Sequence, residues 1–171
     1  WGEVFSDTVN TGIYILSPVV LSLFGKNEMF DFSRDLFPIL LKKGFPIYGY
    51  AIDDYWCDIG DPVVYIQSHI DIMDGKVKVN IPGKEIKDKV WVDDGTVIDE
   101  SVIIKAPCVI GKHTRIKKGS IIGEYSIIGD SNIIEGRSTI KRSILWKNCL
   151  IDHNVELRGS VVCNKVHMYN S

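Results

Sequence analysis

The stretch VIIKAPCVIGKHTRIKKGSIIGEYSIIGDSNIIEGRSTI, residues 102–140, repeats one pattern every six residues. An aliphatic residue recurs at this spacing without interruption, at Val92, Ile98, Ile104, Ile110, Ile116, Ile122, Ile128, Ile134 and Ile140. Helical periodicity does not produce a period of six, and nine successive matches are very improbable from composition alone. A fixed six-residue period is typical of a parallel β-helix, in which each hexad forms one short strand and successive coils stack.

A second set of residues lies two positions before the aliphatic ones and consists mostly of small side chains. Its members are Thr96, Val102, Cys108, Thr114, Ser120, Ser126, Asn132 and Ser138. Because residues two apart on a strand point to the same side, both sets are predicted to face inward. After Ile140 the register shifts by one residue and resumes at Leu145, Ile151 and Leu157. The sequence therefore predicts a left-handed parallel β-helix over residues 90–163, followed by a tail over 164–171.

Composition excludes several classes of function. The formal net charge is −2, and the densest basic run, Lys112 to Lys118, is typical of a solvated face rather than a nucleic-acid site. No apolar stretch approaches the length of a membrane span, and the chain does not open with a signal peptide. Four cysteines show no C-x-x-C spacing, and two of them lie in the inward set of small residues. We expect a reduced, cytoplasmic protein with no membrane or nucleic-acid partner.

The first 75 residues mix the two kinds of secondary structure. Strands are predicted over 8–16, 46–52 and 55–58, and helices over 18–24, 34–43 and 62–75. Lys76 to Lys89, with Pro82-Gly83, is a polar connector. Segment 1–75 has too few strands to bury an independent core, so we interpret it as the end of a larger α/β domain.

Two clusters in this segment carry polar groups suited to binding. Asn10, Thr11 and Gly12 interrupt a predicted strand, and a glycine in a strand often marks the close approach of a ligand or another backbone. The alternative is a β-bulge in which Asn10 satisfies local backbone groups. Asp58 ends a predicted strand before Gly60 and a helix start, a position from which a carboxylate holds Mg²⁺ beside phosphates or simply caps a turn.

The order of these motifs resembles a known family. The runs WGEVFSDTVNTGIYIL, FDFSRDLFPILLKKG and IYGYAIDDYWCDIGDPVVYIQSHIDIMDG, followed by hexapeptide repeats, resemble the carboxy-terminal part of sugar-1-phosphate nucleotidylyltransferases. Within that family the chain is most similar to the mannose-1-phosphate guanylyltransferase-like enzymes. The most specific piece is Y-W-x-D-I-G-x-P-x-x-Y, from Tyr55 to Tyr65. The resemblance implies that residues 1–75 are the end of a Rossmann-like nucleotidyltransferase domain.

The resemblance also implies a reaction and roles for individual residues. In that family the oxygen of a sugar 1-phosphate attacks the α-phosphate of an NTP, with GTP favoured here, and forms an NDP-sugar and pyrophosphate beside Mg²⁺. Asp58 matches the aspartate that binds this metal, and Asn10 matches the residue that contacts sugar hydroxyls. Thr11 and Gly12 match the lining of the same pocket. The family's nucleotide loop, its earlier metal-binding aspartate and its sugar-holding Glu-Lys-Pro segment match nothing in this chain, so no catalytic residue is assigned to it.

Two other functions fit the same sequence. Hexapeptide β-helices also resemble acyltransferases, which usually form trimers with a catalytic histidine at the subunit interface; the candidates are His113, His153 and His167. A regulatory subunit that keeps the fold and binds sugar phosphate or a partner chain is the third hypothesis. Under the nucleotidyltransferase hypothesis the β-helix is expected to serve assembly or regulation, and a homo-oligomer is expected.

Overall fold

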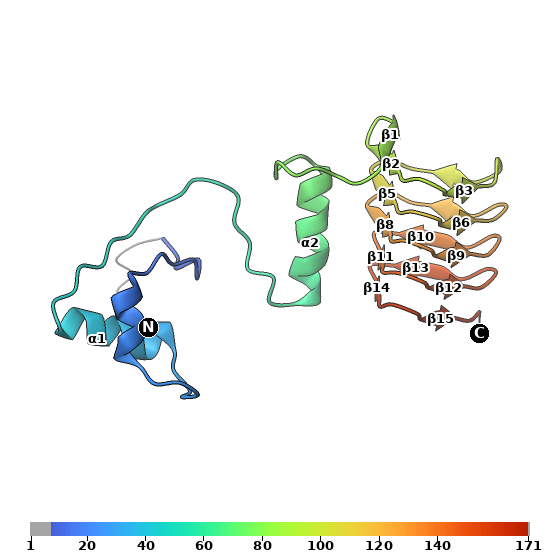
Figure 1. The fold of residues 1–171 in the computed structure, drawn as a ribbon. Helices are drawn as coiled ribbons and strands as arrows, with labels where there is room; N and C mark the ends of the chain where they lie inside the picture. The colour runs from blue at the N-terminus through green and yellow to red at the C-terminus, as the bar shows by residue number, and fades with distance from the viewer. Residues whose placement is uncertain (1–7, 171) are drawn as a thin grey trace. The chain divides into compact units, whose positions relative to one another are not determined.

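The structure, a computed structural model, describes residues 8–170 and divides into two compact units. The first unit ends at Trp56, and the second runs from Cys57 onward. Each unit is described by itself, beginning with the second, which contains the β-helix drawn in Figure 1.

The predicted parallel β-helix is confirmed. Its strands form three sheets, one on each side of the coil (Figure 1). The first sheet contains β1 (Lys84–Lys87), β2 (Val90–Val92), β5 (Cys108–Ile110), β8 (Ser126–Ile128), β11 (Ile144–Leu145) and β14 (Val161–Val162). The second contains β4 (Ile103–Ile104), β7 (Ile121–Ile122), β10 (Thr139–Lys141) and β13 (Glu156–Arg158). The third contains β3 (Val97–Ile98), β6 (Arg115–Ile116), β9 (Ile133–Ile134), β12 (Leu150–Ile151) and β15 (His167–Met168).

The inward residues fill the interior of the coil as the alternation predicts. Ile110, Ile122, Ile128 and Ile134 are fully buried, and each pairs in register with the equivalent residue of the next coil. The six-residue aliphatic period is therefore the core itself. The repeat also continues beyond Val162, because β15 pairs with β12 as the last strand of the third sheet.

The small inward residues connect neighbouring coils through hydrogen bonds. Thr114 Oγ1 donates to the carbonyl of Gly129 at 2.8 Å, and Ser138 Oγ donates to the carbonyl of Asp152 at 2.6 Å. Asn132 Nδ2 donates to the carbonyls of Gly129 and Trp146, while its Oδ1 accepts from the backbone N–H of Cys149 at 2.6 Å. The sequence predicted that these residues are small because corners are tight, and the structure adds that their polar groups satisfy buried backbone atoms.

The register shift after Ile140 is confirmed, and it occurs twice at one corner. Ile122 pairs with Ile140, 18 positions later, whereas Ile140 pairs with Leu157, 17 positions later. The shortened corners follow β10 and β13, with Arg142 and Gly159 both at positive φ. Since Lys141 pairs with Arg158 and Ile144 with Val161, the two one-residue deletions are stacked on each other.

Helix α2 (Pro62–Met73) precedes the β-helix within the second unit. The predicted start is confirmed, because the Asp61 side chain accepts a hydrogen bond from the N–H of Val64 at 2.8 Å and Pro62 occupies the first turn. The predicted connector, 76–89, contains one strand that the sequence did not suggest. This is β1, which pairs antiparallel with β2 at the start of the first sheet.

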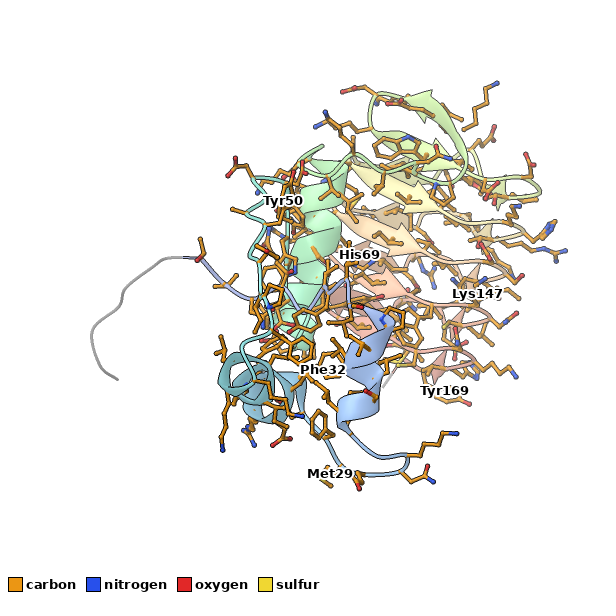
Figure 2. All side chains as sticks on the ribbon, turned by 60° about the vertical axis from the view of Figure 1, so that its left-hand side comes forward. Met29, Phe32, Tyr50, His69, Lys147 and Tyr169 are labelled. Atoms are coloured by element: carbon orange, nitrogen blue, oxygen red, sulfur yellow. The ribbon has the colours of Figure 1, made fainter. Side chains whose placement is uncertain are left out.

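The regular secondary structure among the described residues of the first unit consists of helices. It contains a 3₁₀ helix, η1 (Pro18–Leu23), and a π-helical turn, η2 (Phe32–Leu36), that continues into α1 (Phe37–Lys42). Val20, Leu36 and Leu40 form its small core, surrounded by phenylalanines such as Phe32, which is labelled in Figure 2. Gly44 closes α1 at φ 68°, as predicted for a helix terminus.

The three strands predicted in this region are wrong, because none of residues 8–16, 46–52 and 55–58 is in a strand. A strand needs a hydrogen-bonded neighbour, and none of the described residues 8–56 provides one. Their β-branched and aromatic side chains are consequently left in water, with Ile15 fully exposed and Ile13 exposed by 74%. The residue types favour strands, but the described residues contain no partner strands for these segments.

Candidate functional site

The predicted sugar-contacting residues form a short polar loop in the first unit. Asn10 Oδ1 accepts hydrogen bonds from the backbone N–H of Gly12 at 3.0 Å and from the hydroxyl of Tyr14 at 3.0 Å. Asn10 Nδ2 donates to the same hydroxyl at 2.8 Å. Gly12 has φ 76°, a left-handed conformation that a residue with a side chain rarely adopts. Thr11 is half-buried between them.

This loop is neither a strand nor a β-bulge. Asn10 does satisfy a local backbone group, as the second of the two alternatives stated. It does so by accepting from the N–H of Gly12 in an Asx turn. Tyr14 was not singled out by the sequence, although it holds Asn10 through two hydrogen bonds. In the sequence, this contact was indicated by the spacing alone, since an aromatic residue lies four positions after a polar one.

Asp58 lies in the second unit, four residues before the first residue of α2. Its side chain is exposed and makes no hydrogen bond or ion pair with any other described residue. Its carbonyl accepts from the N–H of Gly60 at 3.0 Å, which turns the chain toward the helix. The nearby Asp61 carboxylate is already used to cap α2, so Asp58 is the carboxylate of this turn that is available to a ligand.

Asp58 by itself does not make a metal centre. Among residues 8–170, no group of three or more His, Cys, Asp or Glu side chains is placed to share an ion. Mg²⁺ takes six oxygens, of which one or two are usually carboxylates and the others come from water and substrate phosphates. The described residues thus supply a single candidate donor, and the remaining donors must come from elsewhere.

A cleft that the sequence did not predict lies between α2, the connector and the first sheet. Its volume is about 400 Å³, and its walls are largely apolar. The residues that line it are His69, Ile72, Met73, Val79, Asn80, Ile81, Pro82, Asp93, Val109, Gly111, Ile127, Ile128, Gly129 and Asp130. His69 on α2, labelled in Figure 2, hydrogen-bonds through Nδ1 with the carbonyl of Tyr65 at 2.8 Å.

Two aromatic side chains of the β-helix fix α2 in place beside this cleft. Trp146 Nε1 donates to the hydroxyl of Tyr65 at 3.2 Å, one turn into the helix. The hydroxyl of Tyr125 donates to Asp74 Oδ1 at 3.0 Å, at the other end. This hydrogen bond to a carboxylate is the main cause of a raised pKa for Tyr125, and it keeps the phenol protonated as a donor. The helix that follows Asp58 is therefore attached at both ends.

The three histidines proposed for acyl transfer lie on the outside of the β-helix. His113 is exposed at a corner with φ 55°, next to the equivalent corner residue Gly95. His153 Nε2 lies 3.5 Å from Glu135 Oε2, and His167 Nε2 lies 3.2 Å from Asp152 Oδ1. Both pairs are consistent with solvated side chains beside carboxylates, and the catalytic role of these histidines stays a prediction.

The basic run of the β-helix is balanced by acidic neighbours. Lys117 Nζ lies 2.6 Å from Glu135 Oε1 of the next coil, and Lys147 Nζ lies 2.8 Å from Asp130 Oδ2. The hydrogen bond from Lys147 is the main reason that the pKa of Asp130 is lowered. Ion pairs of this kind, between lysines and carboxylates of neighbouring coils, are typical of a solvent-exposed face. Across the described part of the chain, no helix has both the length and the apolar character needed to cross a bilayer.

Comparison with known proteins gives a family match for the first part of the chain. Residues 2–75 match the family model for nucleotidyl transferases. A UTP–glucose-1-phosphate uridylyltransferase from Synechocystis is 37% identical over 90 residues, which are 52% of this chain and 23% of that protein. A mannose-1-phosphate guanylyltransferase from Mycobacterium tuberculosis is 31% identical over 71 residues, which are 41% of this chain and 20% of that protein. The chain therefore spans less than a quarter of the length of these relatives.

The solved structures to which the chain is similar are more distant. Serine acetyltransferase isoform 3 from Entamoeba histolytica, in complex with cysteine, is 17% identical and aligns with a TM-score of 0.38. The alignment covers 78% of this chain and 55% of that one. A likeness at this level carries no argument about chemistry.

Proposed function

We propose that this chain, a distant relative of the sugar-1-phosphate nucleotidyltransferases, is the carboxy-terminal part of an enzyme that makes an NDP-sugar and pyrophosphate from an NTP and a sugar 1-phosphate. The observation that carries the proposal is the match of residues 2–75 to the nucleotidyl transferase family, in a segment that contains both Asn10 and Asp58. The exposed apolar side chains of the first unit support it, since they are suited to packing against the strands of a larger domain.

In such an enzyme the residues of this chain would bind and orient substrate. The Asn10 amide, with Thr11 and Gly12, would contact sugar hydroxyls, and the exposed Asp58 carboxylate would be one ligand of Mg²⁺. When bound, Mg²⁺ balances phosphate charge, and the transfer depends mostly on positioning. The described residues provide only this one donor, so the other ligands of the metal would come from the rest of the enzyme, from water and from the phosphates.

Of the nucleotide and sugar pairs, we propose GTP and mannose 1-phosphate first. The Tyr55–Tyr65 segment resembles the mannose-1-phosphate guanylyltransferase-like enzymes, and proteins of that name are among the relatives found. Other relatives are named as a UTP–glucose-1-phosphate uridylyltransferase and a glucose-1-phosphate adenylyltransferase. UTP or ATP with glucose 1-phosphate should therefore be tested beside GTP and mannose 1-phosphate.

The β-helix is proposed to serve assembly or regulation. Its support is the double attachment of α2, since any change in the position of the first sheet is passed through Trp146 and Tyr125 to the helix that follows Asp58. A homo-oligomer built on the β-helix belongs to the same proposal.

The test is pyrophosphate release by the complete polypeptide that carries this chain, assayed with each NTP and sugar 1-phosphate pair with and without Mg²⁺. We expect turnover that requires Mg²⁺ and a rate that falls about a hundredfold or more in Asp58→Asn, as is typical when an electrostatic partner of the reaction is lost. Asp53→Asn, a nearby exposed carboxylate, is the matched control and should leave the rate unchanged. Acetyl transfer from acetyl-CoA without pyrophosphate release would favour the acyltransferase function instead.

A further inference from the structure

The hydrogen bonds of Asn10 determine which end of its amide is available to a ligand. The oxygen and nitrogen of an asparagine amide are assigned from the surrounding donors and acceptors. A backbone N–H can only donate, so the amide atom that faces the N–H of Gly12 at 3.0 Å is Oδ1. The orientation of the amide is therefore fixed by the chain itself.

Tyr14 completes this arrangement. Its hydroxyl donates its one hydrogen to Asn10 Oδ1 at 3.0 Å, and it accepts a hydrogen from Asn10 Nδ2 at 2.8 Å. A carbonyl oxygen has two lone pairs, and an amide nitrogen carries two hydrogens. Within the described residues, both lone pairs of Asn10 Oδ1 are used and one N–H of Nδ2 remains free. Asn10 thus presents a donor, and no acceptor, to a ligand.

The hydroxyl of Tyr14 is held in position by aromatic packing. Its ring lies 5.2 Å from that of Phe37, edge to face, and 5.6 Å from that of Phe32. Both phenylalanines pack on the buried Leu36 and Leu40 core of the first unit. An aromatic ring with two neighbours in this geometry has little freedom to turn, so the hydroxyl stays beside Asn10.

We infer that Tyr14 is a positioning residue, which saturates the acceptor of Asn10 and thereby makes its free N–H the group that recognises a hydroxyl oxygen of the sugar 1-phosphate. This inference rests on the proposed function and adds to it the direction of the hydrogen bond and the residue that sets it. The hydroxyl that Asn10 contacts acts as an acceptor. Without the Tyr14 hydroxyl, the amide oxygen regains a free lone pair and the amide loses its fixed orientation.

The experiment uses the complete polypeptide and compares Tyr14→Phe with the wild type. We expect the KM for the sugar 1-phosphate to rise about three- to tenfold, the effect of one hydrogen bond. The kcat and the KM for the NTP should stay within about twofold. Tyr169→Phe is the matched control, because Tyr169 lies in the second unit and is 68% exposed, so removal of its hydroxyl should change nothing.

A panel of monodeoxy sugar 1-phosphates separates positioning from a general structural effect. In the wild type, the analogue that lacks the hydroxyl contacted by Asn10 should show a reduced kcat/KM. In Tyr14→Phe this penalty should shrink, because the contact is already weakened. Asn10→Asp, which keeps the acceptor oxygens and removes the donor, should abolish the penalty at the same sugar position, and it provides the test if Tyr14→Phe does not fold.

The possible failures are distinct. A wild-type polypeptide that turns over no NTP and sugar 1-phosphate pair overturns the proposed function. If the wild type is active, the Tyr14→Phe variant tests the positioning role by itself. That role is overturned if the variant keeps the wild-type KM for the sugar 1-phosphate and shows the same loss of kcat/KM with the monodeoxy analogue. A penalty that survives in Asn10→Asp overturns the assignment of Asn10 as the donor.

Discussion

The β-helix and the first unit contain the same kinds of apolar side chain, but these are buried in the β-helix and exposed in the first unit. Ile122 and Ile128 are fully buried in the β-helix, whereas Ile13 and Ile15 of the first unit are 74% and fully exposed. The difference is the source of the packing partner. Each coil of the β-helix is covered by the next coil of the same chain, so local sequence supplies the whole core. The strands expected over 8–16 and 46–52 need neighbours that residues 8–56 do not contain.

The reactivity of the cysteines should show the largest contrast. Burial raises the pKa of the Cys108 thiol to about 12, while Cys163 is exposed. The reactive thiolate of Cys108 is therefore about 10⁻⁴ of the total at pH 8, and it increases about tenfold with each pH unit below 12. With a thiol reagent on the folded protein, we expect Cys163 to react at once and Cys108 to react only after unfolding. Rapid labelling of Cys108 in the native protein would contradict the closed interior.

A core substitution in each region should differ strongly in its effect on stability. Ile128→Ala removes buried methyl groups from the centre of the coil and should lower the free energy of unfolding by about 3–5 kcal/mol. Ile13→Ala, at a side chain that is 74% exposed, should change it by less than about 0.5 kcal/mol. Denaturant unfolding followed by circular dichroism measures both. Equal effects in the isolated chain would mean that Ile13 packs against another part of the same chain.

Two asparagines provide the next contrast. Asn132 is fully buried, and its loss leaves the N–H of Cys149 and two carbonyls of the β-helix without this partner. Asn132→Ala should cost about 2–3 kcal/mol of stability. Asn10→Ala should leave stability nearly unchanged and weaken sugar 1-phosphate binding in the complete polypeptide. Thermal unfolding of both variants, beside substrate titrations, would show whether one asparagine is structural and the other functional.

The attachment of α2 should have a smaller effect. Trp146→Phe keeps an aromatic ring on the β-helix and removes the N–H that donates to Tyr65. We expect a loss of about 1 kcal/mol, seen as faster amide hydrogen exchange in α2 with unchanged protection of β5 and β8. Equally faster exchange in the β-helix strands would mean that Trp146 supports the coil and not the helix.

The smallest effect is expected on the charged face. Lys117→Ala removes the ion pair with Glu135, in which the lysine side chain is half exposed. Such pairs contribute less than about 1 kcal/mol, and salt screens them. A melting temperature that falls by more than a few degrees would show that this ion pair stabilises the β-helix more than an exposed ion pair usually does.

The β-helix could be predicted because its information is local and repeated. The period from Val92 to Ile140 specifies both the strands and the inward side, and the shift before Leu145 could be read directly. The extension to β15 was missed because a second deletion after Leu157 moves the last inward residues to Val162 and Met168. The cap of α2 was predictable for a similar reason, since Asp61-Pro62 acts on the turn that follows it.

The candidate site was less accessible to sequence reasoning. Asn10 and Asp58 were selected by resemblance, whereas the Tyr14 contact depends on a left-handed turn at Gly12 that places residues four apart together. The α2 cleft depends on the long-range pairs Tyr65–Trp146 and Asp74–Tyr125. Neither pair has a sequence signal, because exposed aromatic residues on a solenoid face look alike until a partner lies over one of them.

The two stacked deletions after β10 and β13 bear on how such a chain tolerates length changes. The corner after β7 is one residue longer than the corner after β10, yet Ile127 still pairs with Ile144 and Ile128 with Leu145. A residue inserted at Arg142 alone would therefore move this difference in corner length by one coil and leave Ile144 paired with Val161. In this column of corners, a change in length of one residue is thus a local event that the stacked strands on either side do not transmit.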